Sequence, residues 1–165
     1  SIPPPGIDQT PGKVLSLLLL HNNTLSLHLT NIPENLLFFF IPSIFINMEI
    51  IINNNLFNVK SAITDKDIQE GMKGKKFDDT FNGMLFIMNE GSHSFWMKDC
   101  LISLDIIFIS DGKIQKIYSD CPPCREQDDT KCSHYEGAGD MILEISGGDC
   151  IKYDIVEGDS ILIKE

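Results

Sequence analysis

The sequence predicts an α+β fold that is predominantly β, a small β-sandwich or barrel with one or two short helices. Apolar runs of strand length recur from residue 49 onward and are rich in β-branched and aromatic residues. Turn residues such as Asn and Gly separate these runs, and the helix signals are brief. About six to eight short strands with so little helix favour packed layers around one core. A chain of 165 residues is long enough for one such domain.

The stretch at residues 83–109 is the centre of this prediction. Residues 84–88 (MLFIM) are expected to form a buried strand bounded by Gly83 and Gly91, and residues 104–109 (LDIIFI) a second strand. Between them lie charged residues among large apolar neighbours, including the only tryptophan of the chain. Such surroundings shift pKa values and favour functional sites.

Turn and cap residues predict the elements on either side. Asn53-Asn54-Asn55 joins two expected strands, and Asp111-Gly112 is typical of a two-residue hairpin. Thr64 is expected to cap a short helix that ends at Gly71. The remaining expectations are strands at residues 49–52, 56–63, 113–118, 141–145 and 160–163, a cysteine-bearing loop at 119–139, and one helical turn within 147–154.

Charge and composition divide the chain near residue 47. Residues 1–47 carry a net charge of −1 and residues 48–165 a net charge of −10. Residues 1–47 are therefore expected to be a weakly ordered N-terminal extension before a single domain at 48–165, with Met48 as a natural start. The total of −11 opposes binding to nucleic acid or to anionic lipid, because both require clustered Lys and Arg.

Two apolar runs lie in this extension, at residues 14–20 and 36–46. The first is shorter than the apolar region of a typical secretory signal, and the second is interrupted by Pro42. Both are shorter than the ~20 residues that cross a bilayer as a helix. We therefore expect no membrane anchor and a cytoplasmic location, or export if the extension acts as a signal.

An ordered series of short motifs resembles the domain-of-unknown-function family 192 (DUF192), small proteins of bacteria, archaea and some phages. The resemblance covers about residues 63–160 and is greatest to versions from tailed phages of marine bacteria. It implies a β-rich fold and no particular reaction, since the activity of the family is not established. The matching motifs are Gly71-Met72, Gly83-Met84-Leu85-Phe86, Phe95-Trp96-Met97-Lys98, Leu104-Asp105-Ile106-Ile107-Phe108, Asp111-Gly112-Lys113-Ile114, Pro123-Cys124, Cys132, Tyr135, Leu143-Glu144 and Gly158-Asp159.

The residues around the tryptophan are the first candidates for a site. If residues 94–98 are extended, Trp96 and Lys98 point to one face of the strand. Asp105 lies in an apolar strand, where an unpaired carboxylate costs several kcal/mol, so it needs a partner or solvent. Lys98 is the natural partner. The pair forms either a ligand pocket with Trp96 as its platform or a structural salt bridge, and we prefer the structural interpretation. The candidate ligand-binding residues are Trp96, Lys98, Asp99, Asp105, Tyr135 and Glu144.

Glu144 is a second carboxylate within an apolar strand. If Asp105 and Glu144 converge, they could act as an acid/base pair or bind a cation. The simpler alternative is a solvent-facing position on an alternating strand. His93 could line a site or be a solvated turn residue.

The cysteine-bearing loop has three interpretations. Cys121, Cys124, Cys132 and His134 supply four N/S donors, which could hold zinc, although Pro122 and Pro123 remove supporting backbone donors. Alternatively, a disulfide closes the loop between Cys124 and Cys132, the two cysteines that match DUF192. The third interpretation is ordinary reduced thiols. No other cofactor is expected.

Two classes of function stay open. The first is a non-catalytic accessory module that binds a small polar ligand or a protein near Phe95-Trp96-Met97-Lys98. The second is a small hydrolase or metal-dependent enzyme that uses Asp105 and Glu144, or the cysteine-bearing loop.

Overall fold

Two separate β-sheets make up most of the described chain. The computed structural model describes residues 15–17, 27–29 and 47–164, and its chain divides into two units, Ser1–Pro42 and Ser43–Glu165. In the first unit β1 (Leu15–Leu17) pairs antiparallel with β2 (Leu27–Leu29). The rest of the apolar runs predicted at 14–20 and 36–46 lies outside the described residues. No helix among the described residues is long and apolar enough to cross a membrane.

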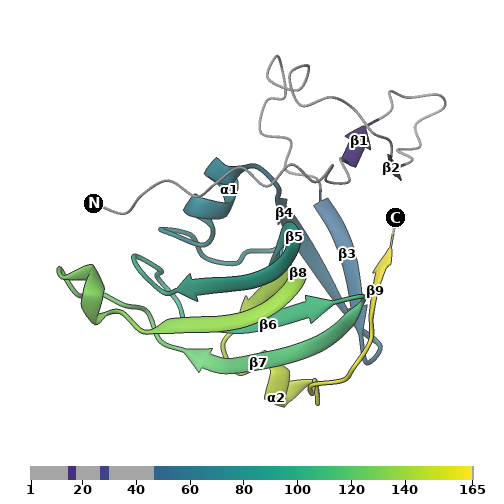
Figure 1. Cartoon of the computed structure of the whole chain (residues 1–165). Coiled ribbons are helices and arrows are strands. Elements are labelled where there is room, and N and C mark those ends of the chain that lie inside the picture. The colour runs from purple at the N-terminus through teal and green to yellow at the C-terminus, as the bar shows by residue number, and fades with distance from the viewer. Residues whose placement is uncertain (1–14, 18–26, 30–46, 165) are drawn as a thin grey trace. The chain divides into compact units, whose positions relative to one another are not determined.

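The second unit is built on a curled sheet of seven strands in the order β7-β6-β8-β5-β4-β3-β9 (Figure 1). All neighbouring strands are antiparallel except β4 and β5, which are parallel. The predicted α+β, predominantly β fold is confirmed. The elements are β3 (Asn47–Ile52), β4 (Asn55–Ala62), α1 (Asp65–Glu70), β5 (Gly83–Trp96), β6 (Leu104–Ser110), β7 (Lys113–Cys121), η2 (Asp129–Lys131), β8 (His134–Ser146), α2 (Asp149–Lys152) and β9 (Ile161–Lys164).

The two ends of this sheet meet and give it a barrel-like closure. Ile114 of β7 exchanges backbone hydrogen bonds with the segment before β9, donating to Asp159 at 2.9 Å and accepting from Gly158 at 2.8 Å. The amide of Ile161 donates to the Gly112 carbonyl at 2.9 Å. Closure pairs the outer strands with each other and so removes part of the exposed sheet edge.

The curled sheet has an apolar cluster on each face. The inner cluster draws on all seven strands, and the outer cluster covers β5, β6 and β8 on the side of α1. Alternation assigns neighbours to opposite clusters: Leu85, Ile107 and Leu143 belong to the inner one, and Phe86 and Phe108 to the outer one. Residues 83–86 of β5, 104–109 of β6 and 142–145 of β8 are therefore buried whichever face they point to, which explains the nearly continuous apolar sequence of these three segments.

Local signals predicted the turns and the first helix correctly. Asn53 and Asn54 have φ of 49° and 63°, and Asp111 has φ of 50°, the left-handed values expected of tight hairpins. Thr64 caps α1 by accepting a hydrogen bond from the Asp67 amide at 3.2 Å. Gly71 ends the helix with φ of 44°.

Three predicted strand boundaries were wrong. Strand β7 runs to Cys121 and not to Tyr118. Strand β5 does not stop at Gly91 but runs to Trp96, and β8 begins at His134 inside the predicted loop. A bulge between Ile87 and Gly91 lets the long β5 bend. Gly139 is required in β8, because a Cβ there would lie 2.2 Å from the Ile109 carbonyl oxygen. Gly139 therefore permits close packing of β8 against β6, whereas a Cβ at Gly91 would meet nothing within 4 Å.

Asp105 ties three segments together at one end of the inner cluster. It is fully buried, and its Oδ1 accepts hydrogen bonds from the backbone amides of Asp120 at 2.7 Å and Gly148 at 2.8 Å. Its Oδ2 accepts one from the Cys150 amide at 2.7 Å. The need for a partner was predicted correctly, but Lys98 is not that partner, because three amides occupy the carboxylate.

Asp105→Asn is expected to lower the free energy of unfolding by about 2–4 kcal/mol. The substitution replaces a charged acceptor with an amide whose NH₂ faces at least one backbone donor. Urea denaturation followed by Trp96 fluorescence measures the change. The matched control is Asp111→Asn, at an exposed turn position that suits Asn, with an expected change within about 0.5 kcal/mol. Equal stability of wild type and Asp105→Asn would contradict a structural role.

Candidate functional site

A cavity of about 580 Å³ lies on the outer-cluster side of the sheet, next to α1 and the second half of β5. Its lining combines aromatic and aliphatic side chains with a few polar groups. The lining residues are Ile68, Gln69, Glu70, Gly71, Met72, Lys73, Phe86, Met88, Ser92, His93, Ser94, Phe95, Trp96, Lys98, Cys100 and Glu144.

Glu144 is the buried polar group of this cavity. Its register partners are Met84 of β5 and Ile106 of β6, both members of the outer cluster. The residue is only 4% exposed, and its Oε2 has no hydrogen-bond partner among the described residues. Burial raises the pKa of Glu144 to about 8, since the charged form loses its hydration. The protein therefore keeps an unpaired, titratable carboxyl at the cavity wall.

Two predictions for Glu144 were wrong. It does not face solvent, because the outer cluster covers β8 where an open face was expected. It also does not converge with Asp105. In the β6–β8 register Asp105 lies opposite Ile145 and Glu144 opposite Ile106, so the two carboxylates point to opposite faces of the sheet.

Aromatic rings form one wall of the cavity. Phe86 and Phe95 make an edge-to-face contact with ring centroids 4.9 Å apart. Trp96 is 37% exposed, and its ring centroid lies 5.8 Å from that of His134 on the neighbouring strand. His93 is held in place, with Nε2 within 2.9 Å of the Asn89 carbonyl oxygen and 3.1 Å of that of Gly139. Ring contacts and the hydrogen bonds of His93 thus hold this wall in place.

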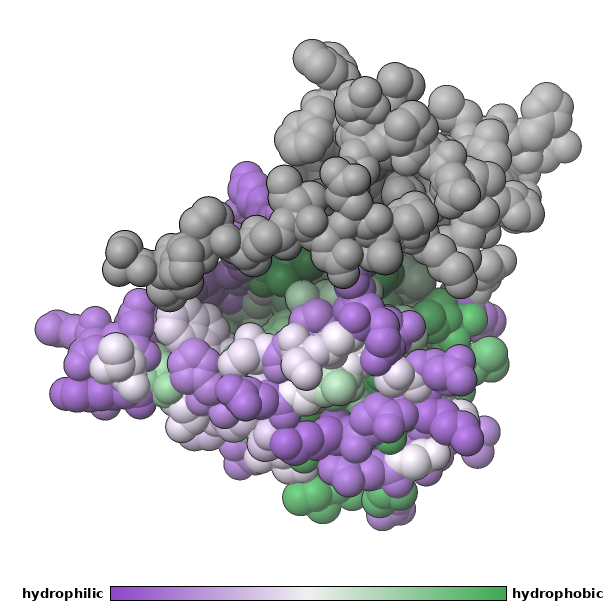
Figure 2. Space-filling view, viewed as in Figure 1, coloured by the Kyte–Doolittle hydropathy of each residue, from purple (hydrophilic) through white to green (hydrophobic). Residues whose placement is uncertain are grey.

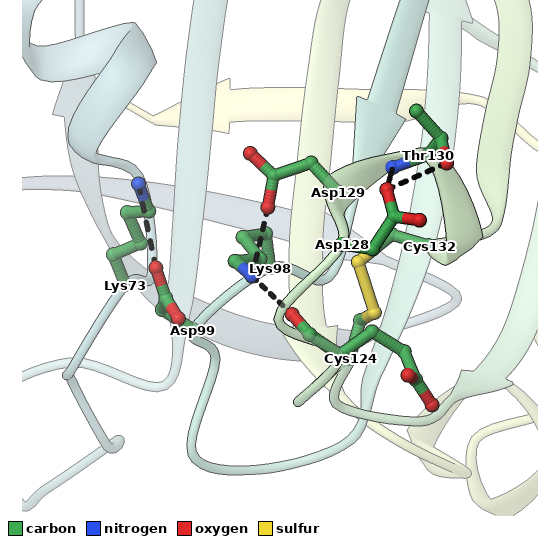
Figure 3. Close-up of a disulfide and its surroundings, with 9 residues drawn as sticks. Lys73, Lys98, Asp99, Cys124, Asp128, Asp129, Thr130 and Cys132 are labelled. Atoms are coloured by element: carbon green, nitrogen blue, oxygen red, sulfur yellow. Dashed lines mark hydrogen bonds and ion pairs between the residues drawn. A yellow bond between two sulfur atoms is a disulfide. The ribbon is translucent and has the colours of Figure 1, made fainter.

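Lys98 lies at the rim and is bound to the loop that follows β7. Its Nζ is 2.8 Å from Asp129 Oδ1 and also donates to the carbonyl of Glu126 (Figure 3). The hydrogen bond with Asp129 raises the pKa of Lys98. A backbone hydrogen bond also connects the two segments, since the Cys124 amide of the loop donates to the Met97 carbonyl at 2.9 Å.

The other predicted ligand-binding residues lie outside the cavity. Asp99 is exposed, and its Oδ2 lies 3.7 Å from Lys73 Nζ. Figure 3 marks this ion pair with a dashed line. Tyr135 is directed to a second, smaller cavity of about 200 Å³ beside Cys124. Asp105 belongs to the inner cluster side. Of the six candidates, Trp96, Lys98 and Glu144 line the same cavity.

A disulfide joins Cys124 and Cys132, the pairing that the family resemblance implied, and closes the loop that contains η2. The zinc hypothesis was wrong, because the disulfide uses two of its four donors. No group of three or more His, Cys, Asp or Glu side chains in the described part of the chain could hold a metal ion. Burial raises the pKa of the Cys121 thiol to about 11 and that of Cys100 to about 12, so both stay protonated at neutral pH.

Reduction of the Cys124–Cys132 disulfide is expected to lower the free energy of unfolding by about 2–3 kcal/mol, because the unfolded chain regains the freedom of a short closed loop. Urea denaturation with and without a phosphine reductant measures the loss. The double variant Cys124→Ser/Cys132→Ser should match the reduced protein and show no further change with reductant. An unchanged denaturation midpoint after full reduction would contradict the prediction.

Stability is expected to fall as pH rises from about 5 to about 8, because Glu144 binds its proton more tightly in the folded chain than at its ordinary pKa of 4.5. Below pH 4.5 both states hold the proton, and above pH 8 the folded state must bury a charge. The full difference is on the order of 3–5 kcal/mol. Urea denaturation at several pH values measures it.

Glu144→Gln should remove this decrease and make the variant more stable than wild type at pH 8.5. The control Glu136→Gln, at an exposed position of β8, should keep the wild-type pH dependence. Parallel profiles for wild type and Glu144→Gln would show that Glu144 does not titrate in this range.

Comparisons with known proteins agree with this fold. Two solved structures resemble the chain: a Sinorhizobium meliloti 1021 protein described as a proposed transcription regulator, and a protein of unknown function from Novosphingobium aromaticivorans DSM 12444. The first has a TM-score of 0.61 and 21% identity, covering 71% of this chain and 92% of its own. The second has a TM-score of 0.60 and 25% identity, covering 71% and 84%. No curated protein matches. The family model of DUF192, described as "Uncharacterized ACR", matches residues 48–163, and the chain therefore belongs to the DUF192 family.

Proposed function

We propose that this domain is a non-catalytic binding module that holds a small ligand in the cavity beside Phe95-Trp96-Met97-Lys98. The observation that carries the proposal is the unpaired Oε2 of buried Glu144 at the wall of a cavity of about 580 Å³. A buried polar atom without a partner destabilises the folded protein, and a ligand that supplies the partner removes that penalty.

The size and lining of the cavity support a small molecule. Ligand sites are commonly 300–1,000 Å³, with mostly apolar walls and a few polar groups that orient the ligand. Here Phe86, Phe95 and Trp96 provide apolar area, and Glu144 provides the polar contact. The fixed positions of His93 and Lys98 keep the rim in place, so little ordering is needed on binding.

The enzymatic alternative has less support. An acid/base pair requires two groups that reach one substrate, and Asp105 and Glu144 lie on opposite faces of the sheet. A metal-dependent reaction at the cysteine-bearing loop requires the donors that the disulfide occupies. The cavity beside Trp96 is therefore the better basis for a function.

Titration with three aromatic probes of similar size tests the proposal: phenethylamine, phenylacetamide and phenylacetate. Trp96 is the only tryptophan and lines the cavity, so its fluorescence reports occupancy. At least one probe is expected to bind saturably with a Kd below about 1 mM, which corresponds to roughly −4 kcal/mol.

Ser92→Phe is expected to weaken that binding at least tenfold, because the added ring fills part of the cavity. Gln115→Phe, an exposed position on β7 that does not line the cavity, is the matched control and should bind like wild type. If none of the three probes binds, or if Ser92→Phe binds as well as wild type, the proposal is wrong.

A further inference from the structure

The cavity holds a carboxyl group that the protein leaves without a counter-charge. No ion pair among the described residues includes Glu144. The two lysines that line the cavity are engaged elsewhere, since Lys73 Nζ lies 3.7 Å from Asp99 and Lys98 Nζ lies 2.8 Å from Asp129. Lys98 is further held by the Glu126 carbonyl. Within residues 47–164, neither lysine of the cavity lining is free to meet Glu144, so a ligand can supply the positive group.

The rest of the cavity also favours a positive charge. Phe86, Phe95 and Trp96 present aromatic rings, and the faces of such rings attract cations. Residues 48–165 carry a net charge of −10, which produces a field that draws cations and repels anions. An anionic ligand would be repelled both by this field and by the ionised carboxylate of Glu144.

Resting on the ligand-binding function proposed above, we infer that the cavity takes an organic ammonium ion. The ligand is a protonated primary or secondary amine whose N–H donates a hydrogen bond to Glu144 Oε2. Its carbon skeleton lies against the aromatic wall. A charge-assisted hydrogen bond of this kind satisfies the buried oxygen and neutralises its charge at the same time.

Binding of an ammonium ion is linked to the loss of one proton from Glu144. Burial raises the pKa of Glu144 to about 8, so at neutral pH the carboxyl is largely protonated and cannot accept the ammonium N–H through both charge and hydrogen bond. The amine stays protonated throughout, the carboxyl O–H bond breaks, and the proton passes to the buffer. Affinity should therefore rise as pH increases toward 8.

The other titratable groups around Glu144 are few. The cavity lining adds Glu70, Lys73, His93, Lys98 and Cys100, and Cys121 lies close enough for Glu144 to raise its pKa. The two thiols remain protonated below pH 8 because burial raises the pKa of each.

Calorimetric titration with phenethylamine, phenylacetamide and phenylacetate at pH 6 and pH 8 tests the inference. Phenethylamine should bind most tightly at pH 8 and about 50-fold more weakly at pH 6, following the ionised fraction of Glu144. A further titration with phenethylamine at pH 7, in two buffers of different ionisation enthalpy, should show release of nearly one proton per bound amine.

Glu144→Gln should weaken phenethylamine binding at pH 8 at least tenfold and abolish proton release, while Glu136→Gln should behave like wild type. A greater affinity for the amide or the carboxylate would overturn the ammonium assignment and leave the binding function intact. The ammonium assignment would also be overturned if the affinity for phenethylamine decreased from pH 6 to pH 8. Unchanged phenethylamine binding by Glu144→Gln would overturn it as well. If none of the three probes binds, the proposed binding function itself is overturned.

Discussion

The burial of three adjacent strand segments, residues 83–86, 142–145 and 104–109, underlies the other features of this structure. Because the curled sheet closes on the inner cluster and α1 helps cover the outer one, a polar side chain in these three segments has no access to water. Each such group must find a partner inside the protein or keep an unfavourable state. Two carboxyl groups on adjacent strands, Asp105 and Glu144, meet this constraint in opposite ways.

Within the described residues, both carboxylate oxygens of Asp105 accept hydrogen bonds, whereas Oε2 of Glu144 accepts none. Three backbone amides from the end of β7 and the start of α2 surround Asp105, so its charge holds the closing segments of the barrel in place. Glu144 receives no such donors and borders a cavity instead. The contrast separates a carboxylate that contributes to stability from one that lowers stability at high pH. Carboxyl groups with a strongly shifted pKa cluster at functional sites, which supports the binding function proposed for this cavity.

A loop closed by a disulfide contacts the rim of the cavity through Lys98. The Cys124–Cys132 bond closes the segment that carries Glu126 and Asp129, the two partners of Lys98. With this loop in place, Lys98 is bound to it and is not free to neutralise Glu144.

On the visible face of the molecule hydrophilic residues predominate, and hydrophobic residues gather at its lower edge, near α2 in the same view (Figure 2). Of the large hydrophobic side chains in this region, Ile151 is 75% exposed.

The sequence by itself determined the local elements: the hairpins at Asn53-Asn54 and Asp111-Gly112, the cap at Thr64, and the predominantly β class. These depend on residues adjacent in the chain, whose conformational preferences can be recognised directly. Only the tertiary structure decided which carboxyl is paired and which is not. The Gly148 amide that binds Asp105 lies 43 positions away, and Glu144 is buried by segments distant in sequence. Burial and hydrogen bonding between such segments follow from strand register and sheet closure, which no short motif encodes.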